Sequence, residues 1–371
     1  MKSHFPLLQI NLHFQDYKFA ILCFITAFVV TMMTIPIIIK FAKKYSLYDM
    51  PNERKEHAFP IPTMGGIAVV AGMMTALFMW LPSHYEAMQI SFFFSVIVIF
   101  FMGIMDDVKD LPARYKFLIQ IGLAILMATA GIRITTFEGF LGIYELPLPA
   151  QYTFTLLTIV GVTNAFNLID GIDGLAGGLG FMSLTTLGIF LTLNNDMTSA
   201  LIAFSLAGGI VAFLYFNFNP AKIFLGDTGS LVLGFSISVL CIRLMQVNTV
   251  TTLPHVPSFI LGIVFIPVFD TLRVFAIRIW KGKSPFQADR THIHHLLTNS
   301  GFGHAFASRL ICCLHGFILI EVYWLRDMKD EYVLLILITF MMIITRILKN
   351  IGGLFKKPST GLSRSFMKID L

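Results

Sequence analysis

The stretch NAFNLIDGIDGLAGG, residues 164–178, places two carboxylates, Asp170 and Asp173, between two long apolar runs. It belongs to a chain of 371 residues that is 56% hydrophobic and only 13% charged. A soluble domain of that length could not cover so many apolar side chains with polar surface. The stretch is therefore predicted to be a polar connection between two membrane-spanning helices.

Apolar runs long enough to cross about 30 Å of hydrocarbon recur along the whole chain. Hydropathy predicts about eleven helical spans, which start near residues 17, 64, 90, 116, 152, 175, 198, 229, 257, 306 and 331. We expect an all-α, polytopic integral membrane protein in which residues 1–371 form a single domain. The first run lacks a small-residue cleavage pattern, so it is expected to remain as a span.

Lysine and arginine gather in alternate connections, after the first, third, seventh and ninth predicted spans and again in the C-terminal tail. Short basic loops stay on the cytoplasmic side of a membrane, so we expect the N-terminus outside and the C-terminus in the cytoplasm. The net charge is +6, but the basic residues adjoin apolar runs and form no patch of their own. This favours anionic membrane lipids and phosphorylated substrates as partners over nucleic acid.

Five polar motifs follow odd-numbered predicted spans and are expected to face the cytoplasm. They are PNERKEHAFPIPTMGG (51–66), MDDVKD (105–110), NLIDGIDG (167–174), NFNPAKIFLGDTGS (217–230) and KGKSPFQADRTHIHH (281–295). Connections on the opposite side, such as NNDM (194–197), carry no comparable set. We expect the five motifs to form one shared site.

Two pairs of carboxylates are the strongest candidates for chemistry. Asp106 and Asp107 end an apolar run, where a solvated loop start is the alternative reading. For Asp170 and Asp173 the alternative is helix capping, which needs only one carboxylate. Because asparagines at positions 164 and 167 precede the second pair, the oxygen ligands exceed what a cap requires, which favours a hard cation or contact with a ribose and base.

The sequence FLGDTGS (224–230) is typical of a turn that binds phosphate or metal, with a simple turn as the alternative. Gly226 and Gly229 would let the backbone approach a ligand, and Asp227 offers an oxygen to Mg²⁺. The lysine and the spacing of a Walker A loop are missing. Asn217, Asn219 and Lys222 precede the turn and strengthen the functional reading.

The histidine motif DRTHIHH (289–295) could bind zinc, bind phosphate, or supply polar residues to the membrane interface. No cysteine lies nearby, Arg290 belongs to the motif, and Arg278 precedes it. The pattern therefore favours contact with a phosphate or diphosphate. In the first motif, His57 leads to Gly65 and Gly66, which would let helices pack closely; a loop that only sets topology is the alternative.

Crowded carboxylates repel one another unless a cation lies among them, and nearby basic side chains imply an anionic substrate. The set of residues therefore indicates Mg²⁺-assisted phosphoryl transfer at the membrane surface. A site at the lipid edge is required if one substrate is itself a lipid.

In this order the five motifs closely resemble those of the polyprenyl-phosphate N-acetylhexosamine-1-phosphate transferases, glycosyltransferase family 4, over almost the full chain. The HIHH form resembles the WecA/TagO branch, which uses UDP-GlcNAc, more than the MraY branch, which uses UDP-MurNAc-pentapeptide and carries three consecutive histidines. The resemblance implies an all-helical bundle in the bacterial inner membrane with a cytoplasmic-facing cleft.

The implied reaction transfers GlcNAc-1-phosphate from UDP-GlcNAc to undecaprenyl phosphate and releases UMP, as the first membrane step of a cell-envelope polysaccharide such as O-antigen or teichoic acid. A related transferase that uses another UDP-N-acetylhexosamine (GalNAc, FucNAc, QuiNAc or MurNAc-pentapeptide) stays open, and a transporter is the distant alternative. The sequence leaves a homodimer open as well.

The resemblance also implies residue roles. Mg²⁺, with Mn²⁺ as a substitute, would be bound by Asp227 and Asn167. The uridine pocket would contain Asp173, Asn217, Phe224 and Gly226. The catalytic set would be Asp106, Asp107, Asp170 and His292, and the phosphates and sugar would contact Lys116, Arg278, Arg290, His294 and His295. An Asp general base, Asp106 or Asp107, is one option; because a phosphate monoester is already mostly a dianion at pH 7, we favour a positioning role for this pair.

Overall fold

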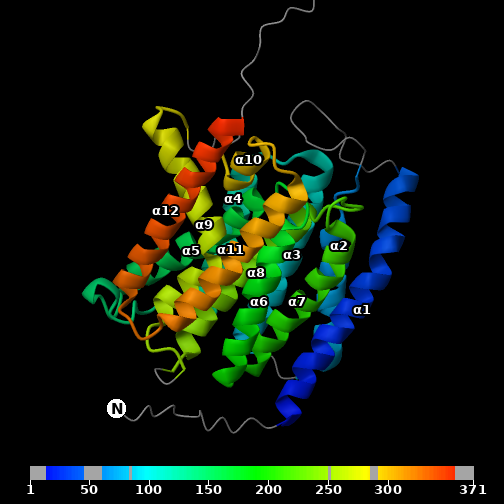
Figure 1. Ribbon diagram of the computed structural model, residues 1–371. Coiled ribbons are helices and arrows are strands. Elements are labelled where there is room, and N and C mark those ends of the chain that lie inside the picture. Colours follow the sequence, from blue (N-terminus) through cyan, green and yellow to red (C-terminus); the bar gives the residue numbers. More distant parts are fainter. Residues whose placement is uncertain (1–13, 46–60, 83–85, 250–251, 285–290, 356–371) are drawn as a thin grey trace, which may run out of the picture.

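The computed structural model describes residues 14–45, 61–82, 86–249, 252–284 and 291–355, and within them the chain is built from α-helices (Figure 1). In chain order they are α1 (Phe14–Tyr45), α2 (Gly65–Trp80), α3 (Ala87–Lys109), α4 (Ala113–Thr129), α5 (Leu148–Ile169), α6 (Leu175–Leu193), α7 (Met197–Asn217), α8 (Gly226–Val247), α9 (Val256–Trp280), α10 (Ile293–Thr298), α11 (His304–Trp324) and α12 (Asp330–Phe355). The predicted all-α, multi-pass membrane fold is confirmed.

Each predicted span corresponds to a helix that starts within about four residues of the expected position. Among the described residues, nine helices are long and apolar enough to cross a membrane. The exceptions are α2 and α4, with 16 and 17 residues, or about 24–26 Å of helix. That length is slightly less than the hydrocarbon thickness. The short helix α10, directly after the first histidine of the HIHH motif, was not predicted.

The two ends of the bundle differ in what they carry. The C-terminal ends of α1, α9 and α12 all point to the top of Figure 1, whereas the described chain begins at the bottom with α1. The described parts of the polar motifs lie at the upper end, where hydrogen bonds join the ends of α3 and α5 to the start of α8 and the end of α7 to the turn before it. We call it the motif end.

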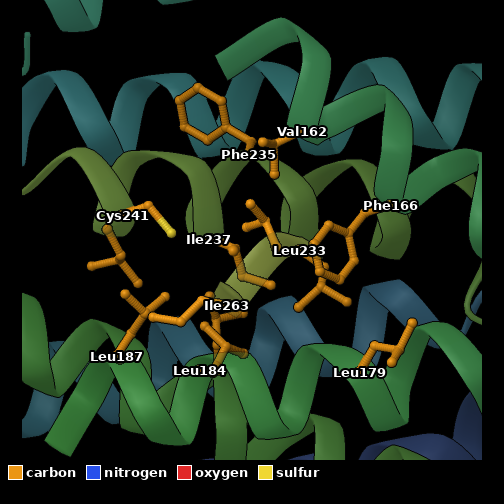
Figure 2. Close-up of a cluster of buried hydrophobic side chains, with 14 of the residues drawn as sticks. Val162, Phe166, Leu179, Leu184, Leu187, Leu233, Phe235, Ile237, Cys241 and Ile263 are labelled. Carbon is orange, nitrogen blue, oxygen red and sulfur yellow. The ribbon is translucent and has the colours of Figure 1, made fainter. Parts of the chain in front are cut away.

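Small residues let the helices approach closely. A side chain at Gly208 of α7 would clash with the backbone carbonyl of Phe24 in α1, and one at Gly72 of α2 would clash with Thr31 of α1. Close contact of this kind drives packing in a bilayer, where apolar side chains gain little by leaving the lipid. The most enclosed helices are α7 and α8, and Figure 2 shows their neighbourhood, where Phe235 of α8 lies toward Val162 of α5 and Leu233 lies toward Phe166.

A polar contact stabilises α9 where its hydrogen-bond ladder is interrupted. Pro267 lies inside α9 and has no N–H to donate to Ile263, four residues earlier. The Ser183 hydroxyl of α6 donates to that carbonyl instead, at 2.8 Å, and also lies 3.2 Å from Nε2 of His315 in α11. The proline therefore helps to join three helices.

Arg243 of α8, a cation inside an apolar run, has a partner. Its Nε lies 2.5 Å from Oδ2 of Asp196, and Asp196 also accepts hydrogen bonds from the backbone N–H and hydroxyl of Ser199 at the start of α7. This ion pair lies at the end of the bundle opposite the motifs. Asp196 caps the start of α7 while it pairs with Arg243, so both charges have a structural role and do not favour the transporter reading.

Candidate active site

The site is built around the first turn of α8, which begins at Gly226 inside the FLGDTGS motif. The segment before α2 pairs with this turn through its backbone: the N–H groups of Gly65 and Gly66 donate to the carbonyls of Phe224 and Leu225 at 2.9 and 2.8 Å, and the N–H of Phe224 donates to Pro62 at 2.8 Å. A Cβ at Gly66 would clash with the backbone of α8. The predicted close helix approach at these glycines is confirmed.

Asp107 of α3 caps α8 from a neighbouring helix. Its Oδ1 accepts from the N–H of Asp227 at 2.7 Å, and its Oδ2 accepts from the N–H and hydroxyl of Thr228 at 3.1 and 2.6 Å. Gly103, one turn earlier in α3, and Gly226, with φ of +73°, permit this close contact. Both oxygens are therefore committed to the free amides and positive dipole end of α8, and they hold Asp227 in place.

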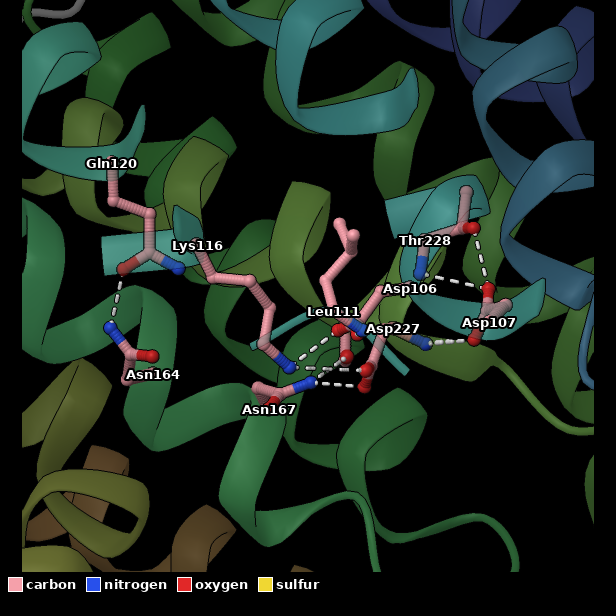
Figure 3. Close-up of polar contacts among 10 residues, drawn as sticks. Asp106, Asp107, Leu111, Lys116, Gln120, Asn164, Asn167, Asp227 and Thr228 are labelled. Atoms are coloured by element: carbon pink, nitrogen blue, oxygen red, sulfur yellow. Dashed lines mark hydrogen bonds and ion pairs between the residues drawn. The ribbon is translucent and has the colours of Figure 1, made fainter. Parts of the chain in front are cut away.

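Asp106 points in a different direction and forms an ion pair with Lys116 of α4 (Figure 3). Its Oδ2 accepts from the lysine Nζ at 2.5 Å, and its Oδ1 accepts from the N–H of Leu111 at 2.8 Å. The same ammonium group lies 3.7 Å from Oδ2 of Asp227. Lys116 thus holds positive charge between two carboxylates that would otherwise repel each other.

Asn167 of α5 also contacts Asp227 (Figure 3). Its amide Nδ2 donates to Oδ1 of Asp227 at 2.6 Å and to the hydroxyl of Ser230 at 3.0 Å. One turn earlier, the amide nitrogen of Asn164 donates to Oε1 of Gln120 at 2.6 Å, which links α5 to α4. The face of α5 that carries both asparagines is therefore directed at α4 and α8.

Asp170 ends α5 as its C-cap residue, and within the described ranges no hydrogen bond to its carboxylate is found. Burial raises the pKa of Asp170 from 3.8 to about 8, and the negative charges of Asp227, Asp107 and Asp173 add to the shift. The capping alternative does not apply to α6, since its N-cap is Gly174 and no side chain caps it in this part of the structure. Asp170 is therefore a carboxylate that lacks a compensating partner.

Two residues predicted to bind uridine, Asp173 and Asn217, hydrogen-bond the turns around this centre to each other. Oδ2 of Asp173 accepts from the side chain of Asn219 and the N–H of Ala221, both at 3.1 Å. The side chain of Asn217 accepts from the N–H of Gly174 at 2.8 Å and donates to the carbonyl of Ile223 at 2.9 Å. These bonds tie the IDGIDG turn to the segment after α7. Direct contact with uridine stays a prediction for Asp173 and Asn217, as it does for Phe224 and Gly226, whose backbones form the FLGDTGS turn.

The histidine motif lies against the IDGIDG turn. A Cβ on Gly171 would lie 2.6 Å from Nε2 of His294, which is 1% exposed. Burial, with the neighbouring His295, lowers the pKa of His294 to about 3, so its ring is neutral at physiological pH. The ring of His294 also stacks on His292, with centroids 5.7 Å apart and an interplanar angle of 9°. Within the described ranges, no three His, Cys, Asp or Glu side chains are grouped as a metal site, so the zinc alternative has no support there.

Three other predicted elements have separate outcomes. Arg278 is buried in the last turn of α9, with its guanidinium 5.9 Å from the ring centroid of Phe275. Arg290, and His57 with most of the first motif, lie outside the described residues. One residue was missed: Asp270 of α9 is fully buried and contacts His292. Its position three residues before Arg273, inside an apolar run, was the available signal.

Comparison with known proteins agrees with the geometry. A sequence model described as Glycosyl transferase family 4 matches residues 89–245, which include the MDD, IDGIDG and GDTGS motifs. A "Probable undecaprenyl-phosphate N-acetylglucosaminyl 1-phosphate transferase" of Bacillus subtilis (strain 168) is 36% identical over 358 residues, 93% of this chain and 97% of the relative. The chain belongs to glycosyl transferase family 4.

Two further relatives carry the same activity in their names. The "Undecaprenyl-phosphate alpha-N-acetylglucosaminyl 1-phosphate transferase" of Salmonella typhi is 34% identical across 75% of this chain and 76% of its own length. The protein of that name from Escherichia coli (strain K12) is 33% identical across 71% of this chain and 72% of its own length. This family 4 chain therefore matches its relatives over most of their length.

The isolated Asp170 predicts a pH-dependent stability of the metal-free protein. Because the folded state disfavours the charged form of Asp170, stability is lost as the pH rises from about 4, the pKa of an unfolded Asp, toward about 8. In EDTA, Asp170→Asn should therefore unfold at a higher temperature than the wild type at pH 8, with the difference vanishing near pH 4. Thermal unfolding of the protein in detergent measures this.

Asp173→Asn is the matched control, because the Asp173 carboxylate already accepts two hydrogen bonds. Asp173→Asn should therefore not raise the unfolding temperature at pH 8. Equal gains for both variants, or no gain for Asp170→Asn, would contradict the assignment of Asp170 as the uncompensated carboxylate.

Proposed function

We propose that this protein transfers GlcNAc-1-phosphate from UDP-GlcNAc to undecaprenyl phosphate, with UMP as the second product, at the cytoplasmic face of the bacterial inner membrane. The observation that carries the proposal is the meeting of Asp106 and Asp227 around Lys116 at the motif end of a membrane-spanning bundle, with Asp170 near enough to Asp227 for their charges to interact. The names of the relatives, one of which matches 93% of the chain, support the same donor and acceptor. The basic connections at this end support its cytoplasmic orientation.

The residues at the centre fit Mg²⁺. This ion is usually bound by one or two carboxylates together with water and substrate phosphates, so it does not require a closed protein shell. Asp227 and Asp106 share a single lysine ammonium, and Asp170 has no partner among the described residues, so the negative charge exceeds the local positive charge. Asp227 and Asp170 would hold the ion, with the Asn167 amide oxygen as a further ligand. A bound ion would neutralise phosphate oxygens on the donor.

The reaction needs alignment and charge neutralisation more than proton transfer. An oxygen of the lipid phosphate attacks the β-phosphorus of UDP-GlcNAc, and the bond from that phosphorus to the bridging oxygen breaks as UMP leaves with the bridging oxygen. The acceptor is mostly a dianion at pH 7, so no proton has to be removed first. Lys116 can neutralise one of the phosphates, and the packed helices around the site limit the access of water.

An apolar groove between α9 and α12 suits the isoprenoid chain of the acceptor. It has a volume of about 890 Å³ and is lined by Leu272, Ala276 and Ile338, with Lys281 and Arg346 toward the motif end. Thr291 and Leu296 also line it, so it reaches the histidine motif. Its apolar wall and basic mouth match a lipid with a terminal phosphate.

A donor panel on purified protein tests the proposed function. With undecaprenyl phosphate and Mg²⁺, UDP-GlcNAc should release UMP faster than UDP-GalNAc or UDP-MurNAc-pentapeptide. Asp227→Asn should lose both activity and Mg²⁺ dependence while it elutes from a sizing column as the wild type does, and Asp327→Asn, at an exposed position, is its control. Faster UMP release with another donor would establish the alternative sugar. No UMP release with any of the donors would contradict the proposed function. A normal Mg²⁺ titration in Asp227→Asn would contradict the metal assignment.

The cap formed by Asp107 predicts a pH-independent defect. Asp107→Asn keeps one acceptor but points an amide N–H₂ at donors of α8, so we expect activity to fall about 10–100-fold by the same factor at pH 6 and pH 8.5. The rate of UMP release at saturating substrates measures this. Asp110→Asn, at an exposed position three residues on, should keep full activity. Recovery of Asp107→Asn at pH 8.5 would instead indicate a general base.

The groove predicts a defect confined to the acceptor. Ala276→Trp should raise the KM for undecaprenyl phosphate about tenfold, since losing about 1.4 kcal/mol of apolar contact has that effect, and should leave the KM for UDP-GlcNAc unchanged. Leu157→Trp, on an exposed face of α5, is the matched control. A change in the KM for UDP-GlcNAc alone would place the acceptor chain elsewhere.

A further inference from the structure

Asp270 of α9 is a buried carboxylate that the mechanism above does not use. It is 0% exposed. Its Oδ1 accepts from Nη2 of Arg273 at 2.8 Å and from the backbone N–H of Ile293 at 3.0 Å, and its Oδ2 contacts Nδ1 of His292 at 2.9 Å. A carboxylate paired with a guanidinium and a backbone amide is ionised and can only accept hydrogen bonds. Nδ1 of His292 must therefore carry the proton.

The same contacts fix the start of α10. His292 is the N-cap residue of α10 and is 6% exposed. Arg273, besides pairing with Asp270, donates to the carbonyl of Thr291 at 2.5 Å. The segment from Thr291 to Ile293 is thus held against α9 by side-chain, backbone and ionic contacts together. Rotation of the His292 ring is restricted at the point where the histidine motif enters the site.

A short path of contacts leads from Asp270 to the carboxylate centre. The ring of His292 stacks parallel to that of His294, and Nε2 of His294 lies against Gly171, the residue directly after Asp170. Because Asp270 occupies Nδ1, the ring atom of His292 left for a ligand is Nε2. In the neutral ring this atom is an acceptor for a sugar hydroxyl, and in the charged ring it is a donor to a phosphate oxygen.

We propose that Asp270 is a positioning residue, which fixes the tautomer and the orientation of His292 so that Nε2 faces the donor substrate. The role of His292 toward substrate rests on the function proposed above, whereas the tautomer does not. Carboxylates that orient a histidine in this way act through that histidine alone. Arg273 balances the charge of Asp270, so the carboxylate does not depend on His292 for a counter-charge.

A double-mutant cycle tests the proposal. Asp270→Asn should lower kcat about 10–100-fold with a smaller change in the KM for UDP-GlcNAc. In the His292→Ala background, the same substitution should cost almost nothing further, because the residue it orients is gone. If the loss of kcat in the double variant equalled the product of the two single losses, the proposal would be overturned. An effect of Asp270→Asn on the KM for UDP-GlcNAc alone would also overturn it. Asp270→Glu, which keeps the charge and shifts it by one methylene, runs the same cycle if Asp270→Asn does not fold.

Asp196→Asn is the matched control. Asp196 is also a buried carboxylate paired with an arginine and a helix start, but it lies at the opposite end of the bundle. Asp196→Asn should lower the unfolding temperature and leave kcat within twofold of the wild type. An equal loss of kcat would mean that Asp270 acts only through general stability.

A second readout does not depend on the reaction. In protein labelled with ¹⁵N-histidine, the resonances that vanish in His292→Ala should show a protonated Nδ1 in the wild type and should change in Asp270→Asn. A protonated Nε2 with a bare Nδ1 would overturn the proposal even if UMP is released as expected. The expected spectrum with no UMP release would leave the tautomer assignment standing and refute only the proposed function.

Discussion

Four carboxylates share one end of a bundle whose interior is mostly apolar, and their mutual repulsion is the constraint on which the site depends. Charge that is removed from water must be paired or hydrogen-bonded, or the group becomes neutral. Asp107 is satisfied by the first turn of α8, and Asp106 by Lys116 and a backbone amide. Asp227 depends on an amide and a shared lysine. Only Asp170 among the four lacks a partner in the described ranges, and the negative charge of the four exceeds the single positive charge of Lys116.

Close helix packing makes this crowding possible. α8 can present its first turn to Asp107 only because glycines in α2 and α3 let its backbone come within contact distance. A larger side chain at Gly66 or Gly103 would push α8 away and break the cap. The same displacement of α8 would separate Asp227 from Lys116. In a bilayer, where apolar burial gives little preference between arrangements, such contacts between small residues determine the register of the helices.

The sequence predicted the helices, their starts and the convergence of the motifs, since hydropathy and the alternation of basic loops are strong local signals. It could not distinguish Asp106 from Asp107. Adjacent residues on a helix point about 100° apart, so one carboxylate turns to α4 and the other to α8, and which is which depends on the rotation of α3 in the bundle. Asp270 was missed for a similar reason: its partner His292 is 22 residues away, and only the packing of α10 on α9 brings them together.

The opposite end of the bundle shows what separates a structural carboxylate from a functional one. Asp196 is buried, pairs with Arg243 and closes the first turn of α7, so its charge is compensated and its oxygens are in use. The oxygens of Asp107 are likewise occupied by donors of a helix start, although Asp107 lies within the site. Its contribution is to fix Asp227 in position. Proximity to the centre therefore does not by itself assign chemistry to a carboxylate. The distinguishing feature is a carboxylate with no donor to either oxygen in the described part of the chain, and among the four at the centre that feature belongs to Asp170, in the IDGIDG turn that joins the two spans α5 and α6.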